Sequence, residues 1–588
     1  MQSAEEVGVD VRELANDSTT PTVARRTTRS QRRLLSESGI ITSLSFGAYL
    51  AVAMLLDFKY YVFPGDAMAR MANGFYVLFS RDPHLGAIGF VWTPLTSILD
   101  LFFLLFKGIW PALATHDVAG SLTSVCAMAA SVYQVRAILA DWGVPRTPRI
   151  LLVALFALNP MIIYYAANGM SEAVYVFTLT AATRYLLRWI RDQDSTRSLV
   201  YAAIMLALAF LGRNEAVASA GLGTALVMVL AFEHSTGTRH HRVMAAATDG
   251  TVFVTPFAVT FAAWAISGYV LTHQLLAQFQ VNALQVSIAG IRLQSATSRL
   301  MHEFHALSYI GPLLPIALVL AVVVALKRHD SQPWAIVCIL GGALAFSLVS
   351  YVNGSIFPWF RFYILVVPIE VLFVGYVLSP GRSTKPERIH AESPQPSRNG
   401  SSRPQTRGRT TMLVSAVGVL AALVIVGPSL PATAKGMFNP IIGPEENQDL
   451  GFIFHRHLTA EDIDSKHHYA HVLSISQFIG RMHLPDGSVV TDDSVECVPE
   501  IVVTSPKAIV FVIPNDRDFD RILADPLTFH AHFMLVPAPV GLSAHNAINQ
   551  EYPNVYRGSE AFVRVAHSFP GTGNCPAFHL LRVVGYTS

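Results

Sequence analysis

Long apolar runs separated by short polar loops constrain the fold of this chain more than any other feature. The first run, residues 39–56, approaches the length of about 20 residues that a helix needs to cross a bilayer, and similar runs recur as far as residue 428. Hydrophobic residues make up 52% of the 588 residues, charged residues make up 14%, and the mean hydropathy is +0.42. Soluble multidomain proteins are more polar than this. The sequence therefore predicts a polytopic membrane protein that is mainly α-helical.

The basic residues predict how the chain is oriented in the membrane. Residues 1–37 are polar, rich in arginine and unlike a signal peptide, so we expect a disordered cytoplasmic tail. The first span then ends outside. Including it, we expect about eleven spans in total. This arrangement leaves the basic loops inside, and the formal net charge of +2 gives no indication of a nucleic-acid partner. The later spans are expected at 118–140, 150–166, 172–189, 198–212, 216–232, 249–269, 307–326, 333–351, 361–379 and 411–428.

The segment 57–117 is expected to be a large first external loop. It is amphipathic and rich in aromatic residues, as in helices that lie in the membrane interface. Its apolar piece from Ile98 to Trp110 is short for a span and contains Asp100 and Lys107, so we expect it to lie flat. If this piece crossed the membrane there would be twelve spans, and the basic loops would move to the outside.

The C-terminal third has two parts of different character. A Pro-, Ser- and Arg-rich cytoplasmic linker is expected at 380–410, followed by the last span at 411–429. Residues 430–588 read as an extracytoplasmic α/β domain, with strand-like runs at 488–492, 508–514, 533–537 and 579–586. Cys497 and Cys575 can pair there in an oxidising compartment, although two free thiols would fit equally well. No CxxC or CxxH spacing predicts a structural zinc site.

The stretch FPGDAMARMANG, at the start of the first loop, carries a candidate functional residue, Asp66. If a helix begins after Pro64 and Gly65, Arg70 and Asn73 share one face with Asp66. A purely structural interpretation is available, in which Asp66 caps the helix and pairs with Arg70 at i+4.

Other ionisable residues gather at the same predicted depth. They lie at the outer ends of the spans, are nearly absent from the middle, and could each be a solvated helix end. As a set they favour chemistry at the outer face, because transporters usually need polar groups near the midplane. The set comprises Glu172, Arg213, Glu215 and Arg361, together with Asp66, Arg70, Arg81, Asp82 and His84.

The acidic start of the first loop, the turns NGMSEA and RNEA, and the segment PWFRFY resemble membrane glycosyltransferases of the GT-C class over residues 38–380. The resemblance implies transfer of a sugar from a polyprenyl-phosphate donor to a glycan, lipid or protein acceptor on the outer side of the cell membrane. It implies Asp66 as the base or acceptor-orienting group. The family often has two adjacent acids here, whereas Ala67 follows Asp66, which leaves Asp82 as the nearest second carboxylate.

The implied reaction is an inverting transfer in which a carboxylate takes the proton of the acceptor hydroxyl and arginine holds the leaving phosphate. Arg361 or Arg213, with Arg70 behind them, are the phosphate-binding candidates. His84 is a further polar contact or simply solvated, and Glu172 and Glu215 orient the arginines or cap helices. Metal dependence stays open, with a divalent ion as the candidate. The alternatives are a lipid-linked glycan flippase or transporter and a non-catalytic envelope scaffold.

Overall fold

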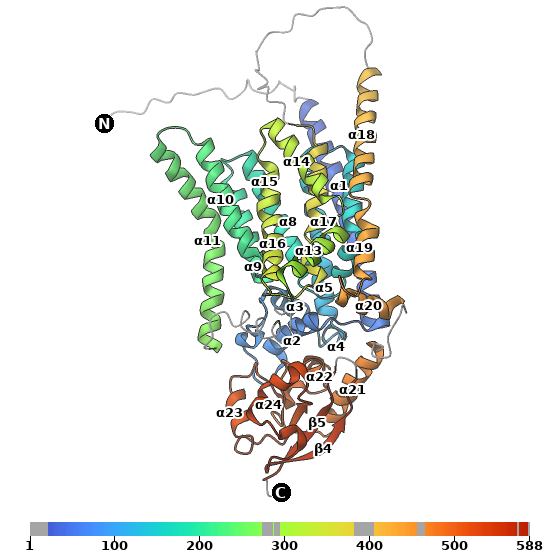
Figure 1. The fold of residues 1–588 in the computed structure, drawn as a ribbon, viewed down its shortest axis with the longest axis vertical. Coiled ribbons are helices and arrows are strands. Elements are labelled where there is room, and N and C mark those ends of the chain that lie inside the picture. Colours follow the sequence, from blue (N-terminus) through green and yellow to red (C-terminus); the bar gives the residue numbers. More distant parts are fainter. Residues whose placement is uncertain are drawn as a thin grey trace, which may run out of the picture.

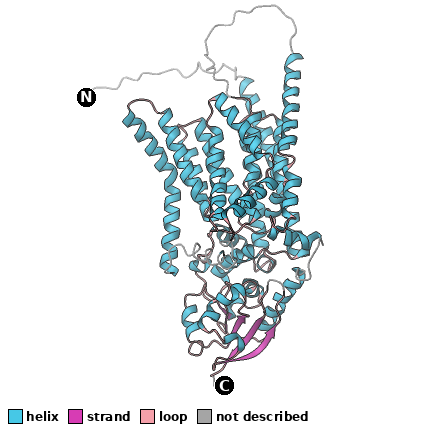
Figure 2. Cartoon of the chain, viewed as in Figure 1, coloured by secondary structure: helices cyan, strands magenta, loops and turns pink. Residues whose placement is uncertain are grey.

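The computed structural model describes residues 22–272, 286, 294–381, 405–454, 465–572 and 575–585. A tall helical bundle forms one end, a small domain with a sheet forms the other, and short helices of the first loop lie between them (Figures 1 and 2). The bundle helices are α1 Thr22–Leu55, α5 Val118–Asp141, α6 Arg146–Ala157, α7 Pro160–Tyr165, α8 Glu172–Arg191, α9 Thr196–Gly212, α10 Ala216–His234, α11 Arg239–Thr272, α13 Ala296–Ile310, α14 Leu314–Arg328, α15 Gln332–Ile336, α16 Gly342–Val352, α17 Val366–Leu378, α18 Gln405–Ile425 and α19 Ser429–Met437.

Each of the predicted spans coincides with helix in the structure. Seven segments within the described residues are long and apolar enough to cross a membrane, or eight if the bent pair α13 and α14 counts as one. Of the other predicted spans, 150–166 is interrupted at Asn159 between α6 and α7, and α9 is shorter. Helix α8 is 20 residues long but is not among the seven. The membrane-helix bundle predicted from the apolar runs is therefore confirmed as a fold class.

One end of the bundle holds the loops that were predicted to be cytoplasmic. Glu37, near the start of the first span, forms ion pairs with Arg136 at 3.2 Å, Arg146 at 3.0 Å and Arg149 at 2.9 Å. Arg136 lies near the end of α5, and the other two arginines lie in the first turn of α6. The loop between α5 and α6 therefore lies at the end of the bundle where the first span starts. Which side of the membrane this end faces stays a prediction.

Two boundaries differ from the sequence prediction. Helix α1 begins at Thr22, inside the expected disordered tail, because no Gly or Pro interrupts residues 22–38. Residues 430–437, assigned to the soluble domain, belong instead to α19, whose Met437 lies in the apolar core of the bundle and whose Leu430 packs against that core. Most of the predicted linker, residues 382–404, lies outside the described residues.

The first loop forms a layer of short helices, and none of those that follow η1 is long enough to count among the candidate spans. Its elements are η1 Leu56–Tyr60, α2 Gly65–Phe79, η2 Leu85–Ile88, α3 Leu95–Leu104 and α4 Ala112–Thr115. Ten residues of α3 extend only about 15 Å, half of a bilayer core. Helices α2 and α3 cross closely at Gly74, where an added Cβ would lie 2.8 Å from the carbonyl oxygen of Ser97. This geometry agrees with the prediction that the apolar piece does not cross.

The C-terminal domain is a mixed five-stranded sheet flanked by helices, in the order β2-β1-β3-β5-β4. Strands β1, β2 and β3 run parallel, and β5 is antiparallel to β3 and β4. Four strands fall on the predicted runs, while β4 was missed because its exposed central residues give no apolar pattern. The elements are α20 Pro444–Phe454, α21 Ser465–Arg481, β1 Val489–Val490, α22 Val498–Thr504, β2 Phe511–Val512, α23 Phe519–Ala524, β3 Phe533–Pro537, α24 Ala547–Glu551, β4 Val563–Phe569 and β5 Phe578–Val583.

The first loop and the C-terminal domain share one apolar core. Along β3, Phe533 and Leu535 point into a cluster that contains Met68 and Phe75 of α2. The alternate residues of β3 pack on the other face of the sheet. The domain therefore covers α2 directly and fixes the position of its first turn relative to the bundle.

Candidate active site

Asp66 lies in the first turn of α2, after Pro64 at φ −56° and ψ 133°. Its Oδ2 is 4.0 Å from Nη1 of Arg70, the i+4 neighbour, but only 2.7 Å from Nη2 of Arg361. The Asp66 side chain is 25% exposed. The start of α2 therefore directs this carboxylate mainly toward an arginine far away in the sequence, which the capping interpretation does not explain.

Arg361 connects three separate parts of the chain. It lies in the turn η5 Phe360–Tyr363, just before α17, and its side chain is 5% exposed. Nη2 donates to Asp66, Nη1 donates to both carboxylate oxygens of Glu445, and Nε lies 3.5 Å from Oε1 of Glu172. The first loop, α8 and α20 thus meet at one guanidinium group.

A glycine turn places Glu172 at the start of α8. Gly169 has a φ of +74°, and an added Cβ would lie 2.5 Å from Oδ2 of Asp117, so only glycine fits. Glu172 is 1% exposed and accepts a hydrogen bond from Nη1 of Arg213. Arg213 also binds Glu215, at 2.7 Å, across the tight turn between α9 and α10. Its pKa stays raised because these two glutamates outweigh the effect of burial.

Buried polar atoms without a hydrogen-bond partner surround this network. Since native proteins pair more than about 90% of such atoms, a concentration of unpaired ones indicates a place for a polar ligand. Both donors and acceptors are present, as a sugar phosphate would require. In the described part of the chain they include Nε of Arg70, Nε of Arg361, Oε2 of Glu172, Oγ of Ser171, Nδ2 of Asn168, Oδ1 of Asn214 and the hydroxyl of Tyr175.

The sequence analysis missed the acids of α20. Glu445 pairs with Arg361, Glu446 accepts a hydrogen bond from the hydroxyl of Tyr165 at 2.5 Å, and Asp449 accepts one from Tyr164. Burial raises the pKa of Asp449 to about 7 and also raises that of Glu446. The signal was the acidic run GPEENQD at residues 443–449, which we assigned to the soluble domain.

Asp82 and His84 lie away from Asp66. They follow the far end of α2, which is about 22 Å long. Asp82 binds Nε of Arg517 at 2.9 Å, and His84 lies 3.8 Å from Asp82, beside the C-terminal domain. The structure therefore offers Glu445, rather than Asp82, as a second carboxylate near Asp66.

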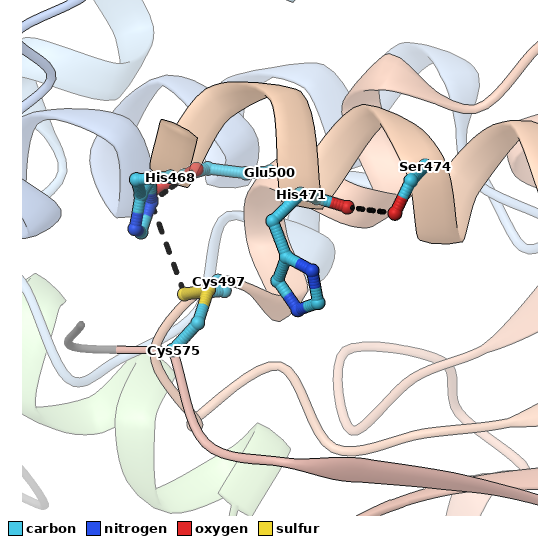
Figure 3. Close-up of a disulfide and its surroundings, with 6 residues drawn as sticks. All are labelled: His468, His471, Ser474, Cys497, Glu500 and Cys575. Carbon is cyan, nitrogen blue, oxygen red and sulfur yellow. Dashed lines mark hydrogen bonds and ion pairs between the residues drawn. A yellow bond between two sulfur atoms is a disulfide. The ribbon is translucent and has the colours of Figure 1, made fainter. Parts of the chain in front are cut away.

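Cys497 and Cys575 form a disulfide that joins the start of α22 to the turn before β5. In Figure 3, His468 of α21 lies beside it, with Nε2 3.9 Å from Sγ of Cys497 and 3.0 Å from Oε2 of Glu500. Among the described residues, His468 and the two cysteines are the one group with ligand atoms close enough to share a metal ion. Because the sulfurs are bonded to each other, this group does not fit a metal, and the acids around Asp66 do not gather closely enough to form such a group.

Glu370 is an ionisable residue within a span that the sequence analysis did not name. Glu370 lies within α17, is 1% exposed, and accepts a hydrogen bond at 2.5 Å from the hydroxyl of Ser429 in α19. The bond to α19 pairs one oxygen of this carboxyl group, while Oε1 has no hydrogen-bond partner among the described residues.

Comparison with solved structures relates this arrangement to a known class. ArnT from Cupriavidus metallidurans, bound to undecaprenyl phosphate, matches with a TM-score of 0.50 at 10% identity, covering 93% of this chain and 98% of that one. The apo form of the same protein matches with a TM-score of 0.48 at 12% identity, again covering 93% and 98%. An oligosaccharyltransferase from Archaeoglobus fulgidus, in complex with Zn and sulfate, matches with 0.41 at 10% identity, covering 87% and 69%. No family model and no curated protein matches the sequence.

The chain therefore has a GT-C-like membrane fold, as the resemblance of its motifs implied. The match to ArnT from Cupriavidus metallidurans extends over nearly the whole length of both chains. At 10% identity this likeness describes the fold alone, so the function has to be argued from the residues of the site.

Proposed function

We propose that this protein is a membrane glycosyltransferase that moves a sugar from a polyprenyl-phosphate donor to an acceptor at the outer face of the membrane. The observation that carries the proposal is the 2.7 Å contact between Asp66 and Arg361. It places a partly exposed carboxylate, able to accept a proton, beside a cation able to hold a phosphate. The bound undecaprenyl phosphate of ArnT supports a lipid phosphate as the ligand.

In the proposed inverting reaction, the acceptor hydroxyl oxygen attacks the anomeric carbon of the donor. The bond from that carbon to the phosphate oxygen breaks, and its electron pair leaves with the polyprenyl phosphate. Asp66 accepts the hydroxyl proton, a contribution of about 10² to 10⁴ in rate. Arg361 and Arg213 stabilise the charge on the leaving phosphate, and the buried Arg70 adds positive potential behind them. Glu172 and Glu215 hold Arg213 in place.

The test is Asp66→Asn, which keeps the shape of the side chain and removes the base. Transfer of a radiolabelled sugar from polyprenyl phosphate is expected to fall at least about 10²-fold, with equal amounts of folded protein in the membrane. Full activity in this variant would exclude Asp66 as the base.

A lipid-linked glycan transporter is the second candidate, and Glu370 is the observation that favours it, because buried carboxyl groups within spans often mark translocation paths. The two proposals separate on wild-type protein. Absence of transfer with every polyprenyl-phosphate sugar tested, together with movement of a lipid-linked glycan across proteoliposome membranes, would favour the transporter.

A further inference from the structure

Both terminal nitrogens of Arg361 donate hydrogen bonds to carboxylates within the protein. Nη1 donates to Glu445, with Oε2 at 2.5 Å, and Nη2 donates to Asp66 at 2.7 Å. Only Nε lacks a hydrogen-bond partner among the described residues. Glu445 accepts from Nη1 with both of its carboxylate oxygens, so a donor phosphate that binds at two points through Nη1 has to displace Glu445 from Arg361.

Glu445 is the carboxylate best able to leave. Glu172 is 1% exposed and is also held by Arg213, whereas Asp66 belongs to the reaction itself. The Glu445 side chain is 23% exposed, and the structure records no other hydrogen bond or ion pair for it in the described part of the chain. Its departure breaks one contact and leaves no second partner unpaired.

The backbone that carries Glu445 is held firmly at the same time. Buried bonds from Tyr165 to Glu446 and from Tyr164 to Asp449 attach α20 to α7. Glu446 is fully buried, so breaking this attachment would be costly. A change of side-chain rotamer at Glu445 is therefore the small motion that frees Arg361, and Glu445 stays close enough to return.

The charges of donor and product explain why the return of Glu445 to Arg361 would assist the reaction. Three arginines, Arg70, Arg213 and Arg361, lie with four carboxylates in the network once Glu445 is included. A donor phosphodiester adds one negative charge, but a phosphomonoester product carries about −1.5 to −2 at pH 7. Arg361 thus holds the product more tightly than the donor, and a neighbouring carboxylate that competes for Arg361 speeds its release.

We propose that Glu445 is a displaceable counter-ion of Arg361, which yields the guanidinium to the donor phosphate and takes it back as polyprenyl phosphate leaves. This role rests on the proposed transferase function. It makes Glu445 a positioning residue, because it acts on the substrate through Arg361.

The test compares Glu445→Gln, Glu445→Asp and the matched control Glu551→Gln, an exposed glutamate of α24. Undecaprenyl phosphate is titrated into each purified protein. We expect a Kd about fivefold lower for Glu445→Gln, about twofold lower for Glu445→Asp, whose reach is shorter, and unchanged for the control. In transfer assays Glu445→Gln is expected to lower KM for the donor and kcat together, because product release slows.

Unchanged or weaker binding of undecaprenyl phosphate in the Glu445 variants would overturn the counter-ion role while leaving the transferase proposal intact. A wild-type protein that shows no saturable binding of this lipid would overturn both. Thermal unfolding of each variant verifies the fold. If Glu445→Gln does not accumulate, the Kd of Glu445→Asp for undecaprenyl phosphate tests the counter-ion role instead.

Discussion

Replacing Arg361 with lysine tests whether the site depends on the shape of the guanidinium or only on its charge. Arg361 serves carboxylates on two different helices, Asp66 at 2.7 Å through Nη2 and Glu445 at 2.5 Å through Nη1. A lysine ammonium keeps the charge but cannot present two parallel donors in one plane. At least one charge-assisted hydrogen bond, worth about 1.5–3 kcal/mol, is therefore lost.

If this bond acts on the leaving phosphate in the transition state, the loss of about 1.5–3 kcal/mol lowers kcat/KM by about 13- to 160-fold. The assay is the initial rate of sugar transfer in proteoliposomes over a range of donor concentrations. The control is Arg146→Lys, which makes the same chemical change at a 75% exposed arginine at the opposite end of the bundle. Activity of Arg361→Lys within about threefold of wild type would refute the assignment of Arg361 to the phosphate.

Two further predictions concern residues beside the C-terminal domain. Asp82→Asn weakens the docking of the first loop on Arg517 only slightly, because water screens an ion pair with a 69% exposed arginine, and it changes the rate of transfer by less than about twofold. A large loss of rate at unchanged thermal stability would instead make Asp82 part of the site. Burial lowers the pKa of His468, but the ion pair with Glu500 more than offsets this and leaves that pKa raised. The stabilisation that the His468–Glu500 ion pair provides is therefore complete below the unfolded pKa of about 6.5 and is lost as pH rises through the folded pKa. The melting temperature should fall between pH 6 and pH 8.5, and it should fall less in His468→Gln. Equal slopes of melting temperature against pH for the two proteins, measured by scanning fluorimetry, would contradict this prediction.

Much of the site was predictable because its residues occupy recognisable places in the chain. Asp66, Glu172, Arg213, Glu215 and Arg361 each sit at the end of an apolar run on the predicted outer side, and the structure brings all five together. The length of a spanning helix is fixed by the bilayer, so equal depth follows from sequence position alone. Equal depth is enough to propose that such residues meet, although it does not say which pairs form.

The sequence analysis was wrong about two acidic residues whose positions do not follow from the ends of the predicted spans. Asp82 was chosen because it is near Asp66 in sequence, but the length of α2 carries it to the C-terminal domain. Glu445 was passed over because the composition changes near residue 430, although the chain continues to pack on the bundle through α19 and α20. A straight helix, such as α2, keeps residues near its two ends far apart even when they are close in sequence. A chain that turns back, as it does before α20, brings residues that are distant in sequence into contact.

The sequence by itself determined the membrane bundle, the flat first loop and the layer of ionisable groups at one end. These follow from apolar length and from charge next to each run, which are local properties of the chain. The partners of those groups were decided only by the tertiary structure. The bond from Arg361 to Asp66 joins residues 295 positions apart, and the one from Arg361 to Glu445 joins residues 84 apart. Contacts at such separations depend on how helices pack, for which no short stretch of sequence carries a signal.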